Sequence, residues 1–447
     1  MKKYIIPSAA LAAIAAPMAF AEGNMPLIQT KYTADPAPIV RNDTIYLYTS
    51  HDEDNAEGFL MKNWLLYTST DMKNWQDRGI PASLKDFKWY DGDNGAWAIQ
   101  VVERNGKWYM YCPIHGHGIG VLVSDSPYGP FTDPIGEPLI WQKEHWYDID
   151  PTVFVDDDGQ AYLYWGNPHL YMVKLNDDMI SYSGPIVQHP DIQDYQEGPW
   201  FWKRGDNYYM AFASTCCPEG IGYAMSKSPT GPWEYKGHIM DHTDRTRGNH
   251  PGIMDYKDKT YLFGQNTDLL KLEQPEYLER RSVSAAEMHY NPDGTIQEVP
   301  YWFDNELKQI EPFNPYRKVE AETMSWGYGM RTTSKNPWGN EKWNQLVTAI
   351  DEGDYIRVSG VDFANGPKEF SVEAQCPLYG GVIEIRVDDV EGPQIGQVNI
   401  TGTKNKIETF TVPVESVKGI HDLYFVFKGS KQQKKNLFNL DSWQFRQ

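Results

Sequence analysis

Three acidic residues, Asp35, Asp150 and Glu197, each open a strand-like run of alternating apolar and aromatic residues. Two further runs of the same kind open at Gly95 and His250. Breaking a glycosidic bond needs one protonated carboxyl to donate to the leaving oxygen and one carboxylate to activate water or to attack the sugar. A third carboxylate can set the ionisation state of the acid, because a nearby negative charge raises its pKa. The three acids therefore match the needs of a glycosidase, provided that the fold brings them together.

The five runs recur at intervals of about 50 to 60 residues, which is near the length of one blade of a β-propeller. Each run is followed by a turn and a Tyr-containing strand, and these tyrosines are Tyr46, Tyr109, Tyr162, Tyr209 and Tyr261. A repeat built only from short strands predicts a five-bladed β-propeller. Equivalent positions of all blades surround one axis in that fold, so we expect the three acids to face one pocket.

Two other residues of these runs could contribute to the same pocket. Trp97 follows Gly95 and is placed to form an apolar wall. His250 could bind a metal, form a hydrogen bond to a carboxylate or fill the axis. The sequence holds no zinc motif of the His-Glu-x-x-His type, no nucleophile elbow and no Gly-rich phosphate loop, so no other catalytic set competes.

The first 21 residues have the features of a secretory signal peptide. Lys2 and Lys3 precede an apolar stretch, which ends in the small-residue cleavage site Ala19-Phe20-Ala21. No later apolar run is long enough to span a bilayer. The sequence therefore predicts a secreted or periplasmic protein that is not held in the membrane.

The charge of the chain narrows the choice of partner. The formal net charge is −20, which disfavours nucleic acid and anionic membranes because phosphate binding needs a basic surface. A neutral polysaccharide fits better, and the chain has 16 Trp and 29 Tyr whose flat faces can stack on sugar rings, although strands also favour aromatic residues. Cys216 and Cys217 are adjacent, which is awkward for a simple bridge, so no disulfide scaffold is expected.

The composition changes at residues 311–315, where two prolines predict a short stiff linker. Alternating stretches beyond it, such as Gly381–Val387 and His421–Phe427, predict antiparallel strands at the spacing of a β-sandwich. The expected fold is all-β, with a five-bladed propeller over residues 22–312 and a β-sandwich (jelly-roll) module over residues 316–447.

The first region resembles glycoside hydrolase family 43, whose members are five-bladed propellers that hydrolyse arabinose- and xylose-containing polysaccharides with inversion. Asp35 stands in Tyr-Thr-Ala-Asp-Pro, which is similar to the family's general-base motif. Asp150 in Ile-Asp-Pro-Thr matches its pKa-modulator motif, and Glu197 in Glu-Gly-Pro matches its general-acid motif. By the same resemblance His250 corresponds to an axial histidine that often contacts a central calcium through water. Arg281 then resembles an arginine that holds substrate, and residues 49–52 resemble the lining of the pocket mouth.

The tail resembles carbohydrate-binding module family 6. The resemblance implies that Glu320, Glu322 and Asp441 hold a structural calcium and that Asn439 lies near the usual sugar cleft. The loop at residues 402–406 lacks the Trp that many members carry there. Two other tryptophans, Trp338 and Trp343, could replace it, or the module could only brace the propeller.

Together these features predict an inverting, exo-acting hydrolase that removes α-L-arabinofuranosyl units from arabinoxylan or its oligosaccharides. β-D-xylosidase activity stays open, because both substrates present a similar pentose outline. Two alternatives are an endo-acting arabinanase, which needs an open groove, and a non-catalytic polysaccharide-binding protein. The second is disfavoured, since a pocket for a neutral sugar has little need to bury three acids.

Overall fold

The computed structural model describes residues 26–447 apart from 55, 57, 144–145, 244–248, 274–279 and 337–342. The described residues contain 31 strands, one α-helix, α1 (Asp268–Glu273), and two short 3₁₀ helices, η1 (Leu84–Asp86) and η2 (Trp302–Asp304). The prediction of an all-β fold is confirmed. None of the described helices is long and apolar enough to cross a membrane. The predicted signal peptide, residues 1–21, and Trp338 lie outside the described residues.

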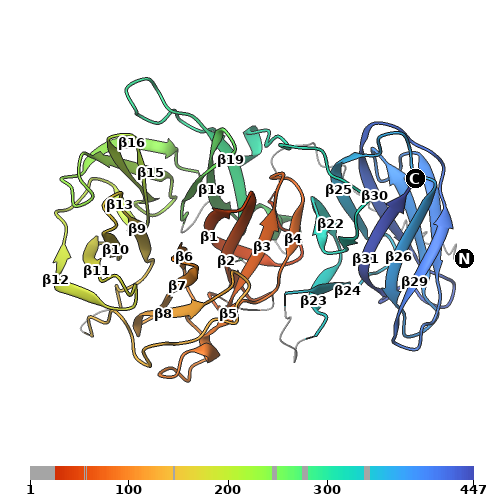
Figure 1. Ribbon diagram of the computed structural model, residues 1–447, viewed down its shortest axis with the longest axis horizontal. Coiled ribbons are helices and arrows are strands. Elements are labelled where there is room, and N and C mark those ends of the chain that lie inside the picture. The colour runs from red at the N-terminus through yellow and green to blue at the C-terminus, as the bar shows by residue number, and fades with distance from the viewer. Residues whose placement is uncertain are drawn as a thin grey trace, which may run out of the picture.

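Five antiparallel sheets follow one another along the described part of residues 32–288 (Figure 1). The first contains β1 (Tyr32–Arg41), β2 (Thr44–Asp52), β3 (Asn63–Ser69), β4 (Trp75–Asp77) and β5 (Ala82–Ser83), and the second contains β6 (Gln100–Arg104), β7 (Lys107–Ile114) and β8 (Gly118–Ser124). The third contains β9 (Thr152–Val155), β10 (Ala161–Trp165), β11 (Tyr171–Leu175) and β12 (Tyr182–Gln188). The fourth contains β13 (Tyr195–Arg204), β14 (Asn207–Ser214), β15 (Ile221–Ser226) and β16 (Glu234–Met240), and the fifth contains β17 (Gly252–Tyr256), β18 (Lys259–Asn266) and β19 (Ser282–Met288).

The sequence repeat corresponds to a structural repeat. Each of the five runs leads into or forms the first strand of a sheet, and the five repeat tyrosines all lie in the second strand. Tight turns join these strands where the residue types allow them. Asn42 and Asp43 (φ 50° and 56°) connect β1 to β2, and Asn105 and Gly106 (φ 54° and 78°) connect β6 to β7. Two consecutive residues with positive φ are the mark of a type I′ hairpin, which matches the twist of the strands.

Hydrogen bonds connect the first sheet to two of the others. The Tyr48 hydroxyl on β2 donates to the carbonyl of Pro127 in the corner after β8 (2.6 Å). The N–H of Thr33 on β1 donates to the carbonyl of Arg281, directly before β19 (3.0 Å). The fifth sheet thus returns to the first, which brings the beginnings of the runs near one another.

The C-terminal region contains two sheets packed over one apolar cluster. Phe370 and Trp443 of one sheet contact Phe425 of the other, at ring-centroid distances of 5.4 and 5.3 Å. One sheet consists of β20 (Val319–Glu320), β23 (Arg331–Ser334), β24 (Gln345–Thr348), β26 (Glu369–Gln375), β29 (Ile407–Pro413) and β31 (Asn439–Arg446). The other consists of β22 (Trp326–Tyr328), β25 (Tyr355–Asp362), β27 (Gly381–Val387), β28 (Gln394–Ile400) and β30 (Ile420–Lys428).

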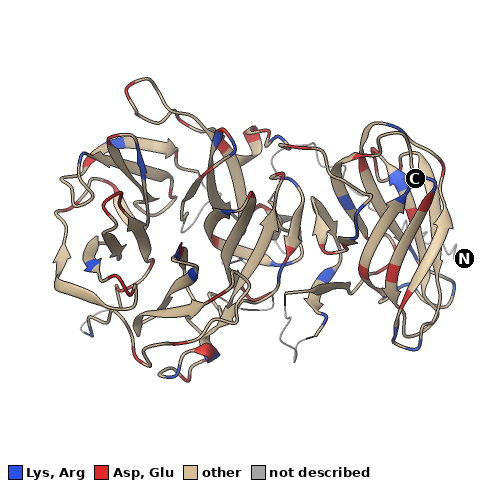
Figure 2. Cartoon of the chain, viewed as in Figure 1, with Lys and Arg blue, Asp and Glu red and all other residues tan. Residues whose placement is uncertain are grey.

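The two regions are joined by direct contacts. Strand β21 (Thr323–Met324) pairs with β4, so the tail adds a strand to the first sheet. The Asn74 side chain exchanges hydrogen bonds of 3.0 and 2.8 Å with the backbone of Ser359. Trp343 packs against Tyr128, with ring centroids 5.8 Å apart. Acidic residues are spread over both regions (Figure 2). The boundaries at residues 312 and 316 stay a prediction.

Candidate active site

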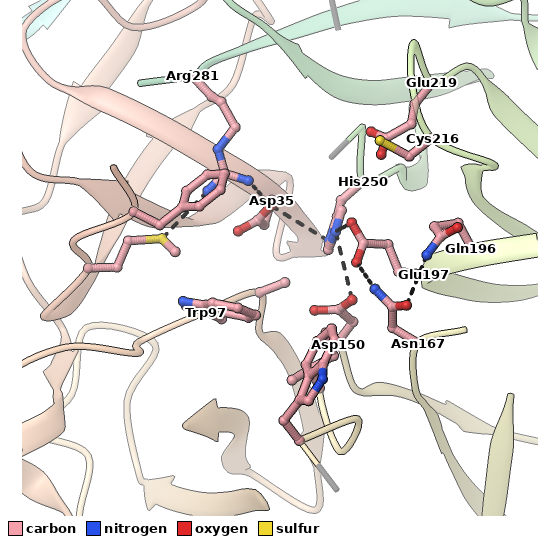
Figure 3. A pocket seen from close by; sticks show the side chains of 15 residues that line it. Asp35, Trp97, Asp150, Asn167, Gln196, Glu197, Cys216, Glu219, His250 and Arg281 are labelled. Atoms are coloured by element: carbon pink, nitrogen blue, oxygen red, sulfur yellow. Dashed lines mark hydrogen bonds and ion pairs between the residues drawn. The ribbon is translucent and has the colours of Figure 1, made fainter. Parts of the chain in front are cut away.

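A pocket of about 250 Å³ contains the three acids, which we call the pocket trio (Asp35, Asp150 and Glu197; Figure 3). Its lining consists of Asp35, Phe59, Met61, Trp97, Ala98, Trp146, Ile149, Asp150, Asn167, Gln196, Glu197, Cys216, Glu219, His250 and Arg281. An adjoining cavity of about 20 Å³ is lined by residues from the starts of all five runs. The structure therefore brings the pocket trio together, as the repeat predicts.

Asp35 lies at a β-bulge, where the register of β1 with β2 shifts between Ala34 and Ala37. Its φ is 51°, a left-handed backbone that costs free energy for a non-glycine residue unless its surroundings hold it. The Asp35 N–H donates to Gln265 Oε1 (2.6 Å), and its Oδ1 accepts from Arg281 Nη1 (3.1 Å). Bulges near active sites re-aim side chains, and this one aims a buried carboxylate into the pocket.

Arg281 is the cation beside Asp35, and Asp52 fixes its orientation. Arg281 donates to Asp52 through Nε (3.0 Å), through Nη2 (2.9 Å) and through its backbone N–H (2.8 Å). Burial opposes the charge of the guanidinium, but Asp35 and Asp52 outweigh it and raise the pKa of Arg281. Residues 49–52 are not among the residues that line the pocket, and their place at its mouth stays a prediction. Asp52 is the buried counter-ion of Arg281.

Asp150 is the most deeply held acid of the trio. Its backbone also has positive φ, 57°, and Oδ2 accepts from the N–H of Gly198 (3.2 Å). Burial raises the pKa of Asp150 to about 8; the charge of His250 opposes that shift, while Glu197 and Asp35 add to it. Burial therefore favours the protonated form of Asp150.

Glu197 is the acid most open to the pocket. It lies in β13 between two register shifts, from Tyr195 to Glu197 and from Glu197 to Trp200. Its side chain is 18% exposed, against 4% for Asp35 and 3% for Asp150. Glu197 Oε2 accepts from Asn167 Nδ2. This exposure suits a residue that must reach the oxygen of a departing group.

The ring of His250 lies between the three carboxyl groups. Nδ1 is 3.6 Å from Asp35, and Nε2 is 3.8 Å from Asp150 and 3.4 Å from Glu197. Burial disfavours the imidazolium, but the three acids outweigh it and raise the pKa of His250 to about 10. Gly198 (φ 59°) lets the backbone approach this ring, since a Cβ there would lie 2.9 Å from His250 Cγ.

Trp97 lines the pocket and stacks on His115, with ring centroids 4.0 Å apart and planes at 23°. It forms an apolar wall with Phe59, Met61 and Trp146. Flat apolar walls beside polar groups are typical of sites that hold sugars and other small molecules.

Asn439 does not line this pocket. It begins β31, and its Nδ2 donates to Gln375 Oε1 (3.0 Å) on the neighbouring strand β26. Its proposed place near a sugar cleft stays a prediction.

Three acids of the tail, here called the module trio, are Glu320, Glu322 and Asp441. Glu320 ends β20, Glu322 lies two residues beyond it, and Asp441 lies near the start of β31. Glu320 Oε2, Glu322 Oε2 and Asp441 Oδ2 are buried without a hydrogen-bond partner among the described residues. Lys335 Nζ lies 2.6 Å from Asp441 Oδ1. Burial raises the pKa of Glu322 to about 8, a hydrogen bond from Gln76 opposes the shift, and Glu320 adds to it. These buried, partly unsatisfied oxygens fit a hard cation.

Several pocket residues were not found from the sequence. Asn167 lies in the connection after β10, and Gln196 Nε2 donates to Asn167 Oδ1 (2.9 Å). Glu219 is a fourth buried acid, and it accepts from the N–H of Asn249 (2.9 Å). Cys216, which the structure pairs with Cys217 in a disulfide contrary to expectation, also lines the pocket. Asn167, Cys216 and Glu219 lie on connections outside the repeat, so nothing in the spacing pointed to them.

The arrangement supports proton transfer at two separated points. Asp35 is buried beside a fixed cation, as a carboxylate that accepts a proton should be. Glu197 is partly exposed on the other side of the His250 ring. Two carboxyl groups on opposite sides of one pocket, one to give a proton and one to take a proton, match the needs of glycoside hydrolysis.

Comparisons with known proteins agree with this chemistry. The family described as "Glycosyl hydrolases family 43" matches residues 24–296, and "Carbohydrate binding module (family 6)" matches residues 320–447. An arabinoxylan arabinofuranohydrolase of Bacillus subtilis (strain 168) is 33% identical over 94% of this chain and 92% of its own length. A xylosidase/arabinosidase of Bacteroides ovatus is 30% identical over 60% of this chain and 95% of its own.

A solved structure extends the likeness to three dimensions. It is a family 43 arabinoxylan arabinofuranohydrolase from Bacillus subtilis in complex with cellotetraose. The TM-score is 0.84 at 31% identity, covering 95% of this chain and 98% of that one. The likeness therefore spans both regions of the molecule.

Proposed function

The chain belongs to glycosyl hydrolase family 43 with a family 6 carbohydrate-binding module, and we propose that it removes terminal α-L-arabinofuranosyl units from arabinoxylan or its oligosaccharides with inversion. The chain is a glycoside hydrolase. The observation that carries the proposal is the gathering of the pocket trio around His250 in one pocket of about 250 Å³. The likeness to an arabinoxylan arabinofuranohydrolase over almost the whole chain supports the choice of substrate.

In the proposed reaction Asp35 is the general base and Glu197 is the general acid. Asp35 takes a proton from a water that attacks the anomeric carbon, and Glu197 gives its proton to the leaving oxygen. The His250 ring lies between these carboxyl groups, with Nδ1 toward Asp35 and Nε2 toward Glu197. An inverting enzyme must fit a water beside its base, and the pocket of about 250 Å³ that Asp35 lines supports this requirement.

Asp150 acts as a positioning residue in this proposal. Its carboxyl accepts from Gly198, the residue after Glu197, and faces His250. Both contacts support an orienting role toward the acid. Trp97 and Arg281 line the pocket, and we assign to them the sugar ring and its hydroxyl groups.

A second candidate activity is β-D-xylosidase. Two relatives, the Bacteroides ovatus xylosidase/arabinosidase and a β-xylosidase of Xylanibacter ruminicola, favour it. The pocket that buries most of the trio supports exo action on one terminal unit, whereas an endo-acting arabinanase needs an open groove.

We propose that the five sheets are the blades of a five-bladed β-propeller and that the two C-terminal sheets form a β-sandwich. The cavity lined from the starts of all five runs and the bond from Thr33 to Arg281 support the ring of blades. The shared apolar cluster of the C-terminal sheets supports the sandwich.

We propose that Glu320, Glu322 and Asp441 hold a structural calcium ion. Their buried oxygens suit calcium, which prefers six to eight oxygen ligands. When bound, the ion would supply positive charge to these carboxylates and connect β20 to β31. The calcium predicted near His250 stays a prediction, since the adjoining cavity of about 20 Å³ has room for about one water.

We further propose that the protein is exported and acts on plant cell-wall polysaccharide. The features of residues 1–21 support export. For the C-terminal module we propose weak xylan binding at most and a bracing role. The contact of Trp343 with Tyr128 and the pairing of β21 with β4 support bracing.

One preparation tests the proposal on four substrates: arabinoxylan, nitrophenyl arabinofuranoside, nitrophenyl xyloside and linear arabinan. We expect arabinose as the main product from arabinoxylan. Proton NMR during the first turnovers should show the anomer opposite to that of the substrate. Oligosaccharides released from the interior of arabinan, or a product with retained configuration, would contradict the proposal.

A further inference from the structure

A side-chain cluster outside the pocket brings two imidazoles and one carboxylate together. Asp194, His238 and His242 each place a ligand atom within 4.8 Å of the other two. Asp194 directly precedes β13, His238 lies on β16, and His242 follows the end of that strand. None of the three lines the catalytic pocket. We propose that this cluster binds a divalent first-row transition-metal ion, for which Zn²⁺ is the probe.

The donor set fits such an ion. His238 Nε2 lies 2.8 Å from Asp194 Oδ2, and the two imidazole rings meet edge to face with centroids 4.5 Å apart. Imidazole nitrogen suits zinc, copper, iron and nickel, whereas magnesium and calcium prefer oxygen. Three protein ligands would leave the remaining positions to water. The side chains of Asp194, His238 and His242 are 19%, 24% and 35% exposed, so an ion can enter from solution.

The groups around the cluster hold the ligands in the required orientation. His242 Nδ1 lies 3.0 Å from Asp241 Oδ1, so Nε2 is the nitrogen that would bind the ion, in place of its contact with Ser214 Oγ. A carboxylate on the far nitrogen of a ligating histidine is the usual second partner at metal sites. Asp194 is fixed at both oxygens, by the N–H of Thr215 (3.2 Å) and the hydroxyl of Tyr235 (3.3 Å). If Asp194 and His238 formed only an isolated surface ion pair, the contact between His242 and Asp241 would not be needed.

The cluster also lies next to a wall of the catalytic pocket. Asp194 precedes Glu197 by three residues on the way into β13. Ser214 Oγ lies 3.1 Å from His242 Nε2, and the turn that follows Ser214 carries the pocket residues Cys216 and Glu219. A bound ion would therefore connect the start of β13 with the end of β16, next to this turn. Its role would be structural, because no ligand of the ion faces the substrate pocket.

Metal titration tests the site independently of hydrolysis. Tag-free full-length protein is stripped with chelator, returned to calcium-containing buffer and titrated with ZnCl₂ by calorimetry. We expect about one Zn²⁺ per chain with micromolar or tighter Kd, and weakening by about 100-fold or more in His242→Gln and Asp194→Asn, since each loses a ligand. His421→Gln is the matched control. His421 Nδ1 lies 2.9 Å from Asp388 Oδ2, so His421 is also paired with a carboxylate. Among the described residues it belongs to no cluster of three possible metal ligands.

Two further readouts separate loss of a ligand from misfolding. Saturating Zn²⁺ should raise the melting temperature of the wild type and of His421→Gln by a few degrees, but not that of His242→Gln. Without metal, His242→Gln should melt within about 2 °C of the wild type, because it replaces a half-exposed side chain. Co²⁺ should give visible d–d absorption only where the site is intact. The proposal would be overturned if the protein bound no Zn²⁺ at concentrations of about 100 μM. Equal affinity for Zn²⁺ in the wild type, His242→Gln and Asp194→Asn would also overturn it.

Discussion

The molecule buries two groups of acids and balances their charges differently. The pocket trio surrounds the ring of His250 at 3.4 to 3.8 Å, and Arg281 lies 3.1 Å from Asp35. The acids raise the pKa of His250 to about 10 despite its burial. The protein therefore supplies positive charge to the three acids of the pocket trio.

The negative charges of the module trio are less completely balanced by neighbouring cations. Lys335 pairs with Asp441, but Glu320 Oε2 and Glu322 Oε2 are buried without a hydrogen-bond partner among the described residues. Burial also raises the pKa of Glu320, and the charge of Asp441 adds to that shift. Buried carboxylates are tolerated only when they are paired, protonated or bound to metal. From this comparison we expect the stability of the module to depend more strongly on calcium than that of the catalytic pocket does.

The largest effect is expected from a substitution in the pocket trio, and it should distinguish the role of that trio from the role of the module trio. Glu197→Gln should lower kcat for arabinoxylan about 10³- to 10⁴-fold, because the leaving oxygen loses its proton donor. Activity on nitrophenyl arabinofuranoside should fall much less, since that leaving group needs little protonation. Initial rates on both substrates, measured by arabinose release and by absorbance, check this.

Glu322→Gln is the matched control in the module, and it should leave hydrolysis of nitrophenyl arabinofuranoside close to the wild-type rate at 25 °C. If Glu197→Gln lowered the two substrate rates equally, Glu197 would not be the general acid. If Glu322→Gln lowered them as much as Glu197→Gln, the separation of the two trios would be wrong.

The next largest effect is expected from removing the buried cation Arg281. Arg281→Met should lower the free energy of unfolding by about 3 kcal/mol, because it leaves Asp35 and Asp52 buried without their partner. Arg281→Lys should lose less, since it keeps the charge and loses only the bidentate geometry. Urea unfolding followed by tryptophan fluorescence measures both. Equal stability of Arg281→Met and wild type would show that the pocket does not need this cation.

The residues of the pocket trio could be predicted because the repeat encodes equivalent positions, whereas their partners could not. Asp52 and Arg281 are 229 residues apart, and neither spacing nor periodicity connects them. Asn167 and Glu219 lie on connections whose course the strand pattern does not specify. Strand β21 has only two residues, Thr323 and Met324, which is too short for a recognisable alternation. Contacts set by tertiary packing were therefore missed, while features repeated in every sheet were found.

Calcium removal should have a moderate effect, confined to the module. The reference is a solution in which the calcium concentration is about 100 times the Kd. Relative to it, chelation should lower the free energy of unfolding of the module by about 2–3 kcal/mol. Calcium must bind the ionised form of Glu322, whose pKa is raised to about 8, so binding should tighten as the pH rises from 6 to 8. Melting scans with calcium or chelator at these pH values measure the effect.

The controls for calcium are two carboxylates of the same module. Glu322→Gln should abolish the stabilisation by calcium. Glu369→Gln should retain it, because Glu369 is paired with Arg446 at the surface. A melting curve that chelator leaves unchanged at both pH values would show that the module trio holds no structural ion.

The smallest expected effect concerns Asp150, the pocket acid whose pKa is raised by burial. The folded-state pKa of Asp150 is raised to about 8 from a usual value near 4, so the folded state binds one proton more than the unfolded state between these pH values. Stability must then fall as the pH rises through that window, by about 1 kcal/mol per pH unit. The stabilisation from His250 is likewise present below about 6.5 and lost as the pH rises through about 10. Asp150→Asn removes only the first contribution, so its free energy of unfolding should decline less than that of the wild type between pH 6 and pH 8.

The kcat/KM of Asp150→Asn should also lose the alkaline change near pH 8, with only a modest decrease at pH 6, because Asn resembles the protonated acid. Urea titrations at pH 6, 7 and 8 measure the stability difference. Parallel profiles for the two proteins would show that Asp150 is ionised throughout, and that His250 and Arg281 then balance all three acids of the pocket trio rather than two.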